Sequence, residues 1–340
     1  MLKSCAWLQN RVSIETDGWT RPCCLEISPH AKIAKISNGI ENAFNDQKLI
    51  TLNYNLANTG FSNKTDFACN RCRQLEENGQ ASLRTTTKYL SAKREIKSIQ
   101  FKLSNRCQLT CLHCSPTLSS GWAKIMKITP IVQESFIITD KFIEELIYLL
   151  PNLTEIKFTG GEPFLDPNHW KILEHLKNYN RSHCELIYIT NGLIKPKYNL
   201  WEGWKSITCN VSIDGYDDTY HWFRRGSNWE ELLKNVLDLK NYSNVNILYS
   251  ITPWTIQDHT KIKNLFTNTA VFFTPIVKPD YASLLEFPKT ISTKYWPNSS
   301  FTQMGSGADN LEKYRNFANY WDSTWNTNGW AYKLYPWLND

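Results

Sequence analysis

The sequence predicts an α/β protein built on a partial, open βα barrel of about six parallel strands. Two observations support this fold class: short strand-like runs alternate with helical patterns, and several of the runs end in a polar or glycine-containing turn. Strands that alternate with helices of about 10–15 residues are typical of βαβ units and a parallel sheet. In barrel-like folds the chemistry lies in the loops after the C-terminal ends of the strands, so we expect these turns to converge on one rim.

Six segments are the strand candidates. Four of them end in a distinctive turn: SIQFKLSN at a cysteine run, TEIKFT at Gly160-Gly161-Glu162-Pro163, ELIYIT at Asn191-Gly192 and SITCNVSI at Asp214-Gly215. The segments VNILYSIT (245–252) and AVFFTPIV (270–277) continue the series. Between them, the spacing of apolar residues predicts helices over 140–150, 167–178 and 228–239.

Alternation along the strands predicts one apolar and one polar face, because successive side chains point to opposite sides. In the fourth strand, one face carries Ile207, Cys209, Val211 and Ile213, and the other carries Thr208, Asn210, Ser212 and Asp214. A closed barrel interior would instead be filled with branched apolar side chains. The pattern therefore predicts helices on the apolar face and a polar cavity on the other, with Lys102, Lys157 and Asn210 pointing into the cavity.

Cys107, Cys111 and Cys114 form a C-x3-C-x2-C run directly after the first of these strands. Cysteine thiolates at short spacing hold iron–sulfur clusters, and three thiolates suit three corners of a cubane. Since no fourth cysteine is nearby, one iron would stay open to a ligand that is not protein, and an open position is typical of reactive metal sites. On the cysteines alone, a zinc knuckle completed by His113 or a distant residue is an equal alternative.

Taken together and in this order, the cysteine run, the GGEP turn and the SIDG turn resemble the radical S-adenosylmethionine (radical SAM) enzymes over residues 97–278. The resemblance implies that Cys107, Cys111 and Cys114 hold a 4Fe–4S cluster whose open iron is chelated by the amino and carboxylate groups of SAM. It further implies that the contacts to this cofactor come from His113, Gly160, Gly161, Glu162, Asn191, Ser212, Asp214 and Arg224.

The chemistry of these residues suits the implied roles. Glycine allows backbone to approach a ligand closely, and Glu162 would add negative charge near the methionine ammonium. Arg224 would pair with the carboxylate through its guanidinium fork, but the sequence does not choose between Arg224 and its neighbour Arg225. His113 takes the place where the family usually has an aromatic residue, and it would stack on adenine.

A second set of cysteines lies in the first 96 residues. The segments DGWTRPCC and CNRCRQLEENGQASLR resemble the half-SPASM module called a Twitch domain. The resemblance implies that Cys5, Cys23, Cys69 and Cys72 hold an auxiliary 4Fe–4S cluster, with Cys24 as the alternative to Cys23. Spacing alone favours a four-cysteine zinc site, whereas a neighbouring radical SAM core favours the cluster.

The chain is expected to divide into a Twitch-like domain at 1–96, the radical SAM core at 97–278 and an aromatic-rich helical extension at 279–340. In the segment from Asp309, one apolar stripe at helical spacing is predicted, formed by Leu311, Tyr314, Ala318, Trp321 and Trp325. No signal peptide or membrane-length apolar run is recognisable. Because reduced clusters need a reducing compartment, we expect a cytoplasmic protein. The net charge of +6 is dispersed over 38 basic and 32 acidic residues, so nucleic acid is not an expected partner.

The resemblance implies an enzyme that reductively cleaves SAM to a 5′-deoxyadenosyl radical and takes hydrogen from a substrate, while the protein orients the reactants. A peptide or protein is the first expectation for the substrate, and a small metabolite, for example in a dehydrogenation, is the second. Electrons would come from a reductant such as flavodoxin or ferredoxin. A non-catalytic metal-binding or redox-sensing protein is the alternative from another class, but a structural metal site has no need of the GGEP and SIDG turns.

Overall fold

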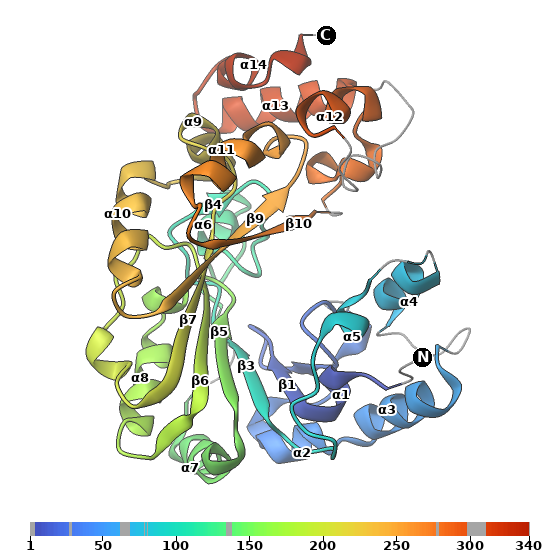
Figure 1. Cartoon of the computed structure of the whole chain (residues 1–340), viewed down its shortest axis with the longest axis vertical. Coiled ribbons are helices and arrows are strands. Elements are labelled where there is room, and N and C mark those ends of the chain that lie inside the picture. Colours follow the sequence, from blue (N-terminus) through green and yellow to red (C-terminus); the bar gives the residue numbers. More distant parts are fainter. Residues whose placement is uncertain are drawn as a thin grey trace. The chain divides into compact units, whose positions relative to one another are not determined.

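The computed structural model in Figure 1 describes residues 4–26, 29–61, 69–77, 79, 81–133, 138–276, 279–297 and 311–339. The chain forms two compact units. The first unit consists of Met1–Cys107, Pro116–Ile189 and Pro196–Thr208, and the second consists of Gln108–Ser115, Thr190–Lys195 and Cys209–Asp340. Each unit is described separately below.

Eight strands form one sheet in the order β10-β9-β7-β6-β5-β3-β1-β2, and the boundary between the units falls within β7 (Trp204–Ser212). In the first unit the strands are β1 (Arg11–Ile14), β2 (Thr20–Arg21), β3 (Ser98–Lys102), β5 (Glu155–Thr159) and most of β6 (Arg181–Thr190). The pairs β1–β3, β3–β5 and β5–β6 are parallel, and β2 runs antiparallel to its partner β1. The chain therefore has the predicted α/β fold with a mostly parallel sheet.

The helices of the first unit are α1 (Ala6–Asn10), α2 (Ile40–Phe44), α3 (Gln47–Thr59), α4 (Asn70–Glu77), α5 (Leu83–Thr86), α6 (Ser120–Ile125), α7 (Asp140–Leu149) and α8 (Pro167–Leu176). The predicted helices at 140–150 and 167–178 are confirmed as α7 and α8. Helix α8 begins where the sequence favours a start, because the side chain of Asp166 accepts a hydrogen bond from the N–H of Asn168 and Pro167 occupies the first turn.

The second unit contains the parallel pair β9 (Asn244–Ile251) and β10 (Ala270–Pro275), and a separate antiparallel pair, β4 (Thr110–Cys111) with β8 (Arg224–Arg225). Its helices are α9 (Asp218–Phe223), α10 (Trp229–Leu239), α11 (His259–Leu265), α12 (Lys289–Tyr295), α13 (Glu312–Thr324) and α14 (Trp330–Leu334). Helix α10 confirms the prediction at 228–239. No helix in the described ranges is both long and apolar enough to span a membrane.

All six predicted strands are present, as β3, β5, β6, β7, β9 and β10. The expected number of about six was too small, because the N-terminal segment adds β1 and β2 to the same sheet. The predicted alternation is also confirmed: Ile207, Cys209 and Val211 of β7 are buried, whereas the intervening residues are half-buried. The partial barrel and the polar cavity remain predictions.

The aromatic stripe near the C-terminus is confirmed by α13, whose buried residues include Tyr314, Ala318 and Trp321. The predicted start of this segment, Asp309, lies outside the described residues. Trp321 donates its indole N–H to the carbonyl of Trp222 in α9 at 2.9 Å. The stripe therefore packs against a helix of its own unit.

Candidate functional site

In the first unit, the glycine turn after β5 lies against the segment that leads into the cysteine run. The N–H of Gly161 donates to the carbonyl of Ser104 at 3.1 Å, and the N–H of Glu162 donates to the carbonyl of Arg106 at 2.6 Å. A Cβ atom on Gly161 would lie only 2.3 Å from the carbonyl oxygen of Arg106, so the position requires glycine. The turn thus fixes the residue immediately before Cys107.

The neighbours of Gly161 in the turn are also tightly constrained. Gly160 has a φ of +113°, which favours glycine, and a Cβ there would lie 3.1 Å from the Cβ of Lys102. Glu162 is only 1% exposed, and its Oε1 accepts a hydrogen bond from the N–H of Phe164 at 3.2 Å. The void beside Glu162 measures about 10 Å³, which is room for a single water. The expected contact between Glu162 and an ammonium group remains a prediction.

Two polar residues that the sequence analysis missed shape the start of the cysteine run. The N–H of Cys107 donates to the hydroxyl of Ser120 at 3.2 Å, and that hydroxyl donates back to the carbonyl of Cys107 at 3.1 Å. Asn105 donates to the carbonyls of Pro116 and Ile131 at 2.8 and 3.0 Å. Neither residue belongs to a motif, so only the folded loop reveals them.

In the second unit, the rest of the cysteine run is tied to β8. Cys111 is the register partner of Arg224, and the N–H of Leu112 donates to the carbonyl of Phe223 at 2.8 Å. Burial raises the pKa of the Cys111 thiol to about 12, although Arg224 opposes this shift. Burial likewise raises the pKa of Cys114. These thiols would therefore deprotonate on binding a metal, which releases protons.

Asp214 and Arg224, both predicted cofactor contacts, form a buried ion pair. The guanidinium donates from Nε and Nη2 to Oδ2 of Asp214 at 2.8 and 2.5 Å, and the N–H of Ser250 donates to Oδ1 at 2.8 Å. Burial alone would raise the pKa of Asp214, but Arg224 and His113 bring it below its ordinary value. The carboxylate therefore stays charged beside the cysteine run. Pairing of Arg224 with a ligand carboxylate is still a prediction.

His113 interacts electrostatically with both members of this ion pair. Its ring centroid is 5.2 Å from that of Phe223, with the planes tilted by 32°. Its Nδ1 is buried and makes no hydrogen bond within the described part of the chain. Burial lowers the pKa of His113, and Asp214 opposes the shift. A neutral ring with an unused polar atom suits contact with a ligand, as the adenine prediction requires.

Asn191 is held by a residue of the cysteine run that the sequence analysis did not single out. The side-chain amides of Asn191 and Gln108 exchange two hydrogen bonds, at 3.2 and 3.1 Å. Oδ1 of Asn191 also accepts from the N–H of Leu193 at 2.9 Å. Ser212, the last residue of β7, is half-buried. Contacts of Asn191 and Ser212 with SAM remain predictions.

The structure separates the neighbours Arg224 and Arg225, which the sequence could not. Arg225 donates from Nη2 to the hydroxyl of Thr327 at 3.0 Å and lies 3.6 Å from Oδ1 of Asp322. Its guanidinium also lies 4.8–5.9 Å from the ring centroids of three tryptophans, Trp321, Trp325 and Trp330. Because the guanidinium of Arg225 already contacts side chains in and around α13 and α14, Arg224 is the better candidate for a ligand contact.

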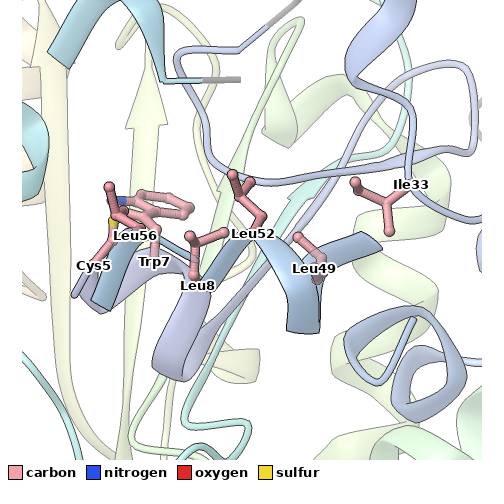
Figure 2. Packing of buried hydrophobic residues seen from close by; sticks show 7 residues of the cluster. All are labelled: Cys5, Trp7, Leu8, Ile33, Leu49, Leu52 and Leu56. Carbon is pink, nitrogen blue, oxygen red and sulfur yellow. The ribbon is translucent and has the colours of Figure 1, made fainter. Parts of the chain in front are cut away.

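One hydrophobic cluster in the first unit, drawn in Figure 2, includes or contacts several of the N-terminal cysteines. Cys5 belongs to this cluster, next to Trp7 and Leu56, and three further cysteines pack against it: Cys23, Cys24 and Cys69. Burial raises the pKa of Cys23 to about 12, with smaller contributions from Cys24 and Cys5. Burial also raises the pKa of Cys5, to which Cys72 adds and which Arg84 opposes. All four predicted ligands therefore lie in one neighbourhood, together with Cys24.

Cys24 faces a different environment from Cys23. Burial raises its pKa, while two lysines of the sheet, Lys157 and Lys102, lower it. This favours Cys23 as the residue that joins Cys5, although the choice stays a prediction.

Among the described residues, no group of three or more His, Cys, Asp or Glu side chains is arranged to hold a metal ion. The donor chemistry of both cysteine sets nevertheless fits iron–sulfur clusters, since thiolates are their usual ligands.

In the first unit the strands lead into the glycine turn and Cys107, and the second unit holds Cys111, Cys114 and the buried Asp214–Arg224 pair. Residues 101–265 match the model of the radical SAM superfamily of enzymes, so this segment of the chain is similar to that superfamily. The similarity implies a 4Fe–4S cluster and SAM as cofactors.

The chain is similar to several named proteins. Over 154 residues it is 29% identical to the radical SAM cyclopropyl synthase TigE of Paramaledivibacter caminithermalis, covering 42% of this chain and 32% of that protein. Over 130 residues it is 30% identical to a GTP 3′,8-cyclase of Staphylococcus epidermidis, covering 37% and 36%. The match with a solved structure of anSMEcpe with bound AdoMet and a peptide has a TM-score of 0.42 at 18% identity, and covers 67% and 61% of the two chains. The chain thus spans about a third of the length of the two curated relatives.

Proposed function

We propose that this protein reductively cleaves SAM and uses the resulting 5′-deoxyadenosyl radical to take a hydrogen atom from a substrate. The observation that carries the proposal is the pairing of β4 with β8 in a chain whose residues 101–265 match the radical SAM model. This pairing places the buried Asp214–Arg224 pair beside Cys111. A purely structural cysteine site would have no use for such a pair, because burying two charges is costly.

In this proposal Cys107, Cys111 and Cys114 hold a 4Fe–4S cluster, which together with SAM supplies the radical chemistry when bound. The turn at Gly160-Gly161-Glu162 fixes the entrance to the cysteine run. Asp214 keeps Arg224 oriented and charged, so that a guanidinium N–H not used by Asp214 is available to a carboxylate. The two hydrogen bonds between Asn191 and Gln108 hold the middle of the cysteine run in place.

A second 4Fe–4S cluster on Cys5, Cys23, Cys69 and Cys72 is part of the proposal. It is supported by the gathering of Cys5, Cys23 and Cys69 at one hydrophobic cluster and by the electrostatic interaction of Cys72 with Cys5. Arg84, which is ion-paired with Glu76, adds positive charge near Cys5 and Cys72. A cation there would offset the negative charge of a thiolate-ligated cluster.

We propose a peptide or protein as the substrate, on the strength of the Twitch-like cysteine segments. The second candidate is a small metabolite, which the similarity to a GTP 3′,8-cyclase favours. We further propose a cytoplasmic location and a reductant such as flavodoxin or ferredoxin as the electron donor.

The test is 5′-deoxyadenosine formation by protein reconstituted with iron and sulfide without oxygen, then given SAM and a strong reductant. We expect product from the wild type and none from the C107A/C111A/C114A variant. Equal product from both proteins would refute the cysteine assignment. Failure of the loaded wild type, with or without a panel of peptides and nucleotides, would favour the metal-binding alternative.

A further inference from the structure

The polar face of the sheet in the first unit carries charged side chains in ordered rows. In β5, residues Glu155, Lys157 and Thr159 are half-buried, whereas Ile156 and Phe158 between them are buried. The register aligns Ser13 of β1 with Gln100 of β3, and Gln100 with Lys157 of β5. On the other side, Lys157 is aligned with Ile187 of β6. The row that holds Lys157 therefore contains no carboxylate.

The carboxylates in the adjoining rows are all paired with other cations. Glu15 receives two hydrogen bonds from the ammonium of Lys102, at 2.8 and 2.7 Å, and a third from the hydroxyl of Ser13 at 3.0 Å. Glu155 accepts from the guanidinium of Arg11 at 3.0 Å. In the next strand, Glu185 lies 3.2 Å from the ammonium of Lys205.

Lys157 is thus the cation of this face that forms no ion pair or hydrogen bond with a carboxylate within the described part of the chain. Burial lowers its pKa, and the nearby Cys24 and Glu155 only oppose this shift. Buried charges are ordinarily paired, because removing them from water is costly. An ammonium kept on a polar sheet face without a partner is therefore expected to meet its counter-ion in a ligand.

The position of Lys157 along β5 suits a substrate contact. Lys157 lies in β5, and Gly160 directly follows the last residue of that strand, Thr159, so the two positions are about 10 Å apart along an extended chain. That is the length of a small organic molecule or a few residues of peptide. A substrate that reaches the glycine turn could place an anionic group at Lys157.

We propose that Lys157 binds an anionic group of the substrate, a carboxylate or a phosphate. This inference rests on the proposed function, because it assumes that a substrate enters this face of the sheet. The competing interpretation is structural: Lys157 would offset the negative charge of the neighbouring Cys24 thiol or of a cluster beside it.

The experiment measures binding of inorganic phosphate and, separately, of acetate to the reconstituted full chain by isothermal titration calorimetry. Four proteins are compared: the wild type, K157M, K157R and K205M. The last is the matched control, since it removes a lysine of the same sheet that already has a carboxylate partner. Iron content and the urea midpoint are recorded for each, and so is 5′-deoxyadenosine formation without added substrate.

We expect K157M to weaken binding of the preferred anion about tenfold, as loss of a charge-assisted hydrogen bond predicts. K157R and K205M should bind like the wild type, and the tighter of the two anions gives the chemical class. K157M should keep its iron and its urea midpoint, because an apolar side chain replaces an unpaired charge on a half-buried side chain.

Three results would overturn the proposal. These are wild-type binding of both anions weaker than about 10 mM, unchanged binding by K157M, and loss of iron or of folding in K157M, which would indicate the structural role. Failure of the proposed radical reaction would be recognised separately, because neither the wild type nor K205M would then form 5′-deoxyadenosine. The anion titrations would still decide the role of Lys157.

Discussion

At the scale of single residues, Gly161 shows how a sequence signal can identify the right position for a different reason. The sequence suggested that a glycine here lets backbone approach a ligand. In the structure the backbone that approaches is that of Arg106, whose carbonyl oxygen would lie 2.3 Å from a Cβ on Gly161. A methyl group at this position must push away the segment that leads into Cys107.

We therefore predict that G161A lowers the free energy of unfolding by about 1–3 kcal/mol, as overpacking does, and reduces iron bound by the cysteine run. Urea denaturation and iron analysis measure the two effects. G60A is the matched control, since a Cβ on Gly60 meets no atom within 4 Å and its φ of +72° costs only backbone strain. If G161A proves no more harmful than G60A, the close approach is not important.

Asp214 carries a prediction about pH. Its pKa is lowered in the folded protein, so the stability it adds is complete above its ordinary value of 3.8 and is lost as the pH falls through the lower folded value. D214N leaves Arg224 buried without its partner, which is expected to cost about 3–5 kcal/mol near neutral pH. The difference between wild type and D214N should shrink below about pH 4.

The measurement is the urea midpoint of both proteins in the metal-free state between neutral and acidic pH. E144Q on the exposed side of α7 serves as the control and should follow the wild type throughout. If the wild type stays more stable than D214N by the same free energy of unfolding at acidic pH, the stabilising ion pair between Asp214 and Arg224 is contradicted.

Several site residues were beyond the reach of the sequence. Asn105, Gln108 and Ser120 support the cysteine run through hydrogen bonds, yet polar side chains in loops carry no periodic or motif signal. Arg224 and Arg225 are chemically identical, and only the alternation of side chains along β8 separates them.

At the scale of elements, the predicted strands share a feature that the unpredicted strand β1 lacks. Each predicted strand is followed by a glycine or polar turn, or belongs to a series of regular βα units. Strand β1 is only four residues long and directly follows α1. Its alternation of Arg11 and Ser13 with Val12 and Ile14 is too short to stand out. It becomes a strand because β3 offers it a parallel edge.

The two-residue strand β8 has its own prediction, because Arg225 links it to α13 and α14. Replacing Arg225 by methionine leaves the buried carboxylate of Asp322 without its cation and removes contacts with three tryptophan rings. We expect a loss of about 3 kcal/mol in the free energy of unfolding. Trypsin should also cleave the C-terminal segment faster.

The control for R225M is K333M, which removes an exposed lysine of α14. R225K should fall between them, since lysine keeps the charge but not the planar fork. Equal trypsin sensitivity of R225M and K333M would mean that Arg225 does not anchor the segment.

At the scale of the whole molecule, the sequence predicts two separate cysteine sets, and the structure brings Cys5, Cys23, Cys24 and Cys69 of the N-terminal set to one hydrophobic cluster of the first unit. What the sequence could not give is ligand geometry. Thiols without a metal stay protonated and pack as small apolar groups, so their final arrangement depends on the ion that they bind. The choice between Cys23 and Cys24 belongs to the same problem.

The two cysteine sets are predicted to load independently, because the N-terminal set shares no ligand with the run at Cys107, Cys111 and Cys114. The C107A/C111A/C114A variant should therefore keep about half of the iron of the wild type, and the C69A/C72A variant should keep the other half. Iron and sulfide analysis, with electron paramagnetic resonance of the reduced proteins, measures each set. In the C69A/C72A variant the signal should still change on addition of SAM, since the open iron belongs to the other set. Loss of all iron in either variant would mean that the two sets depend on each other or form a single site.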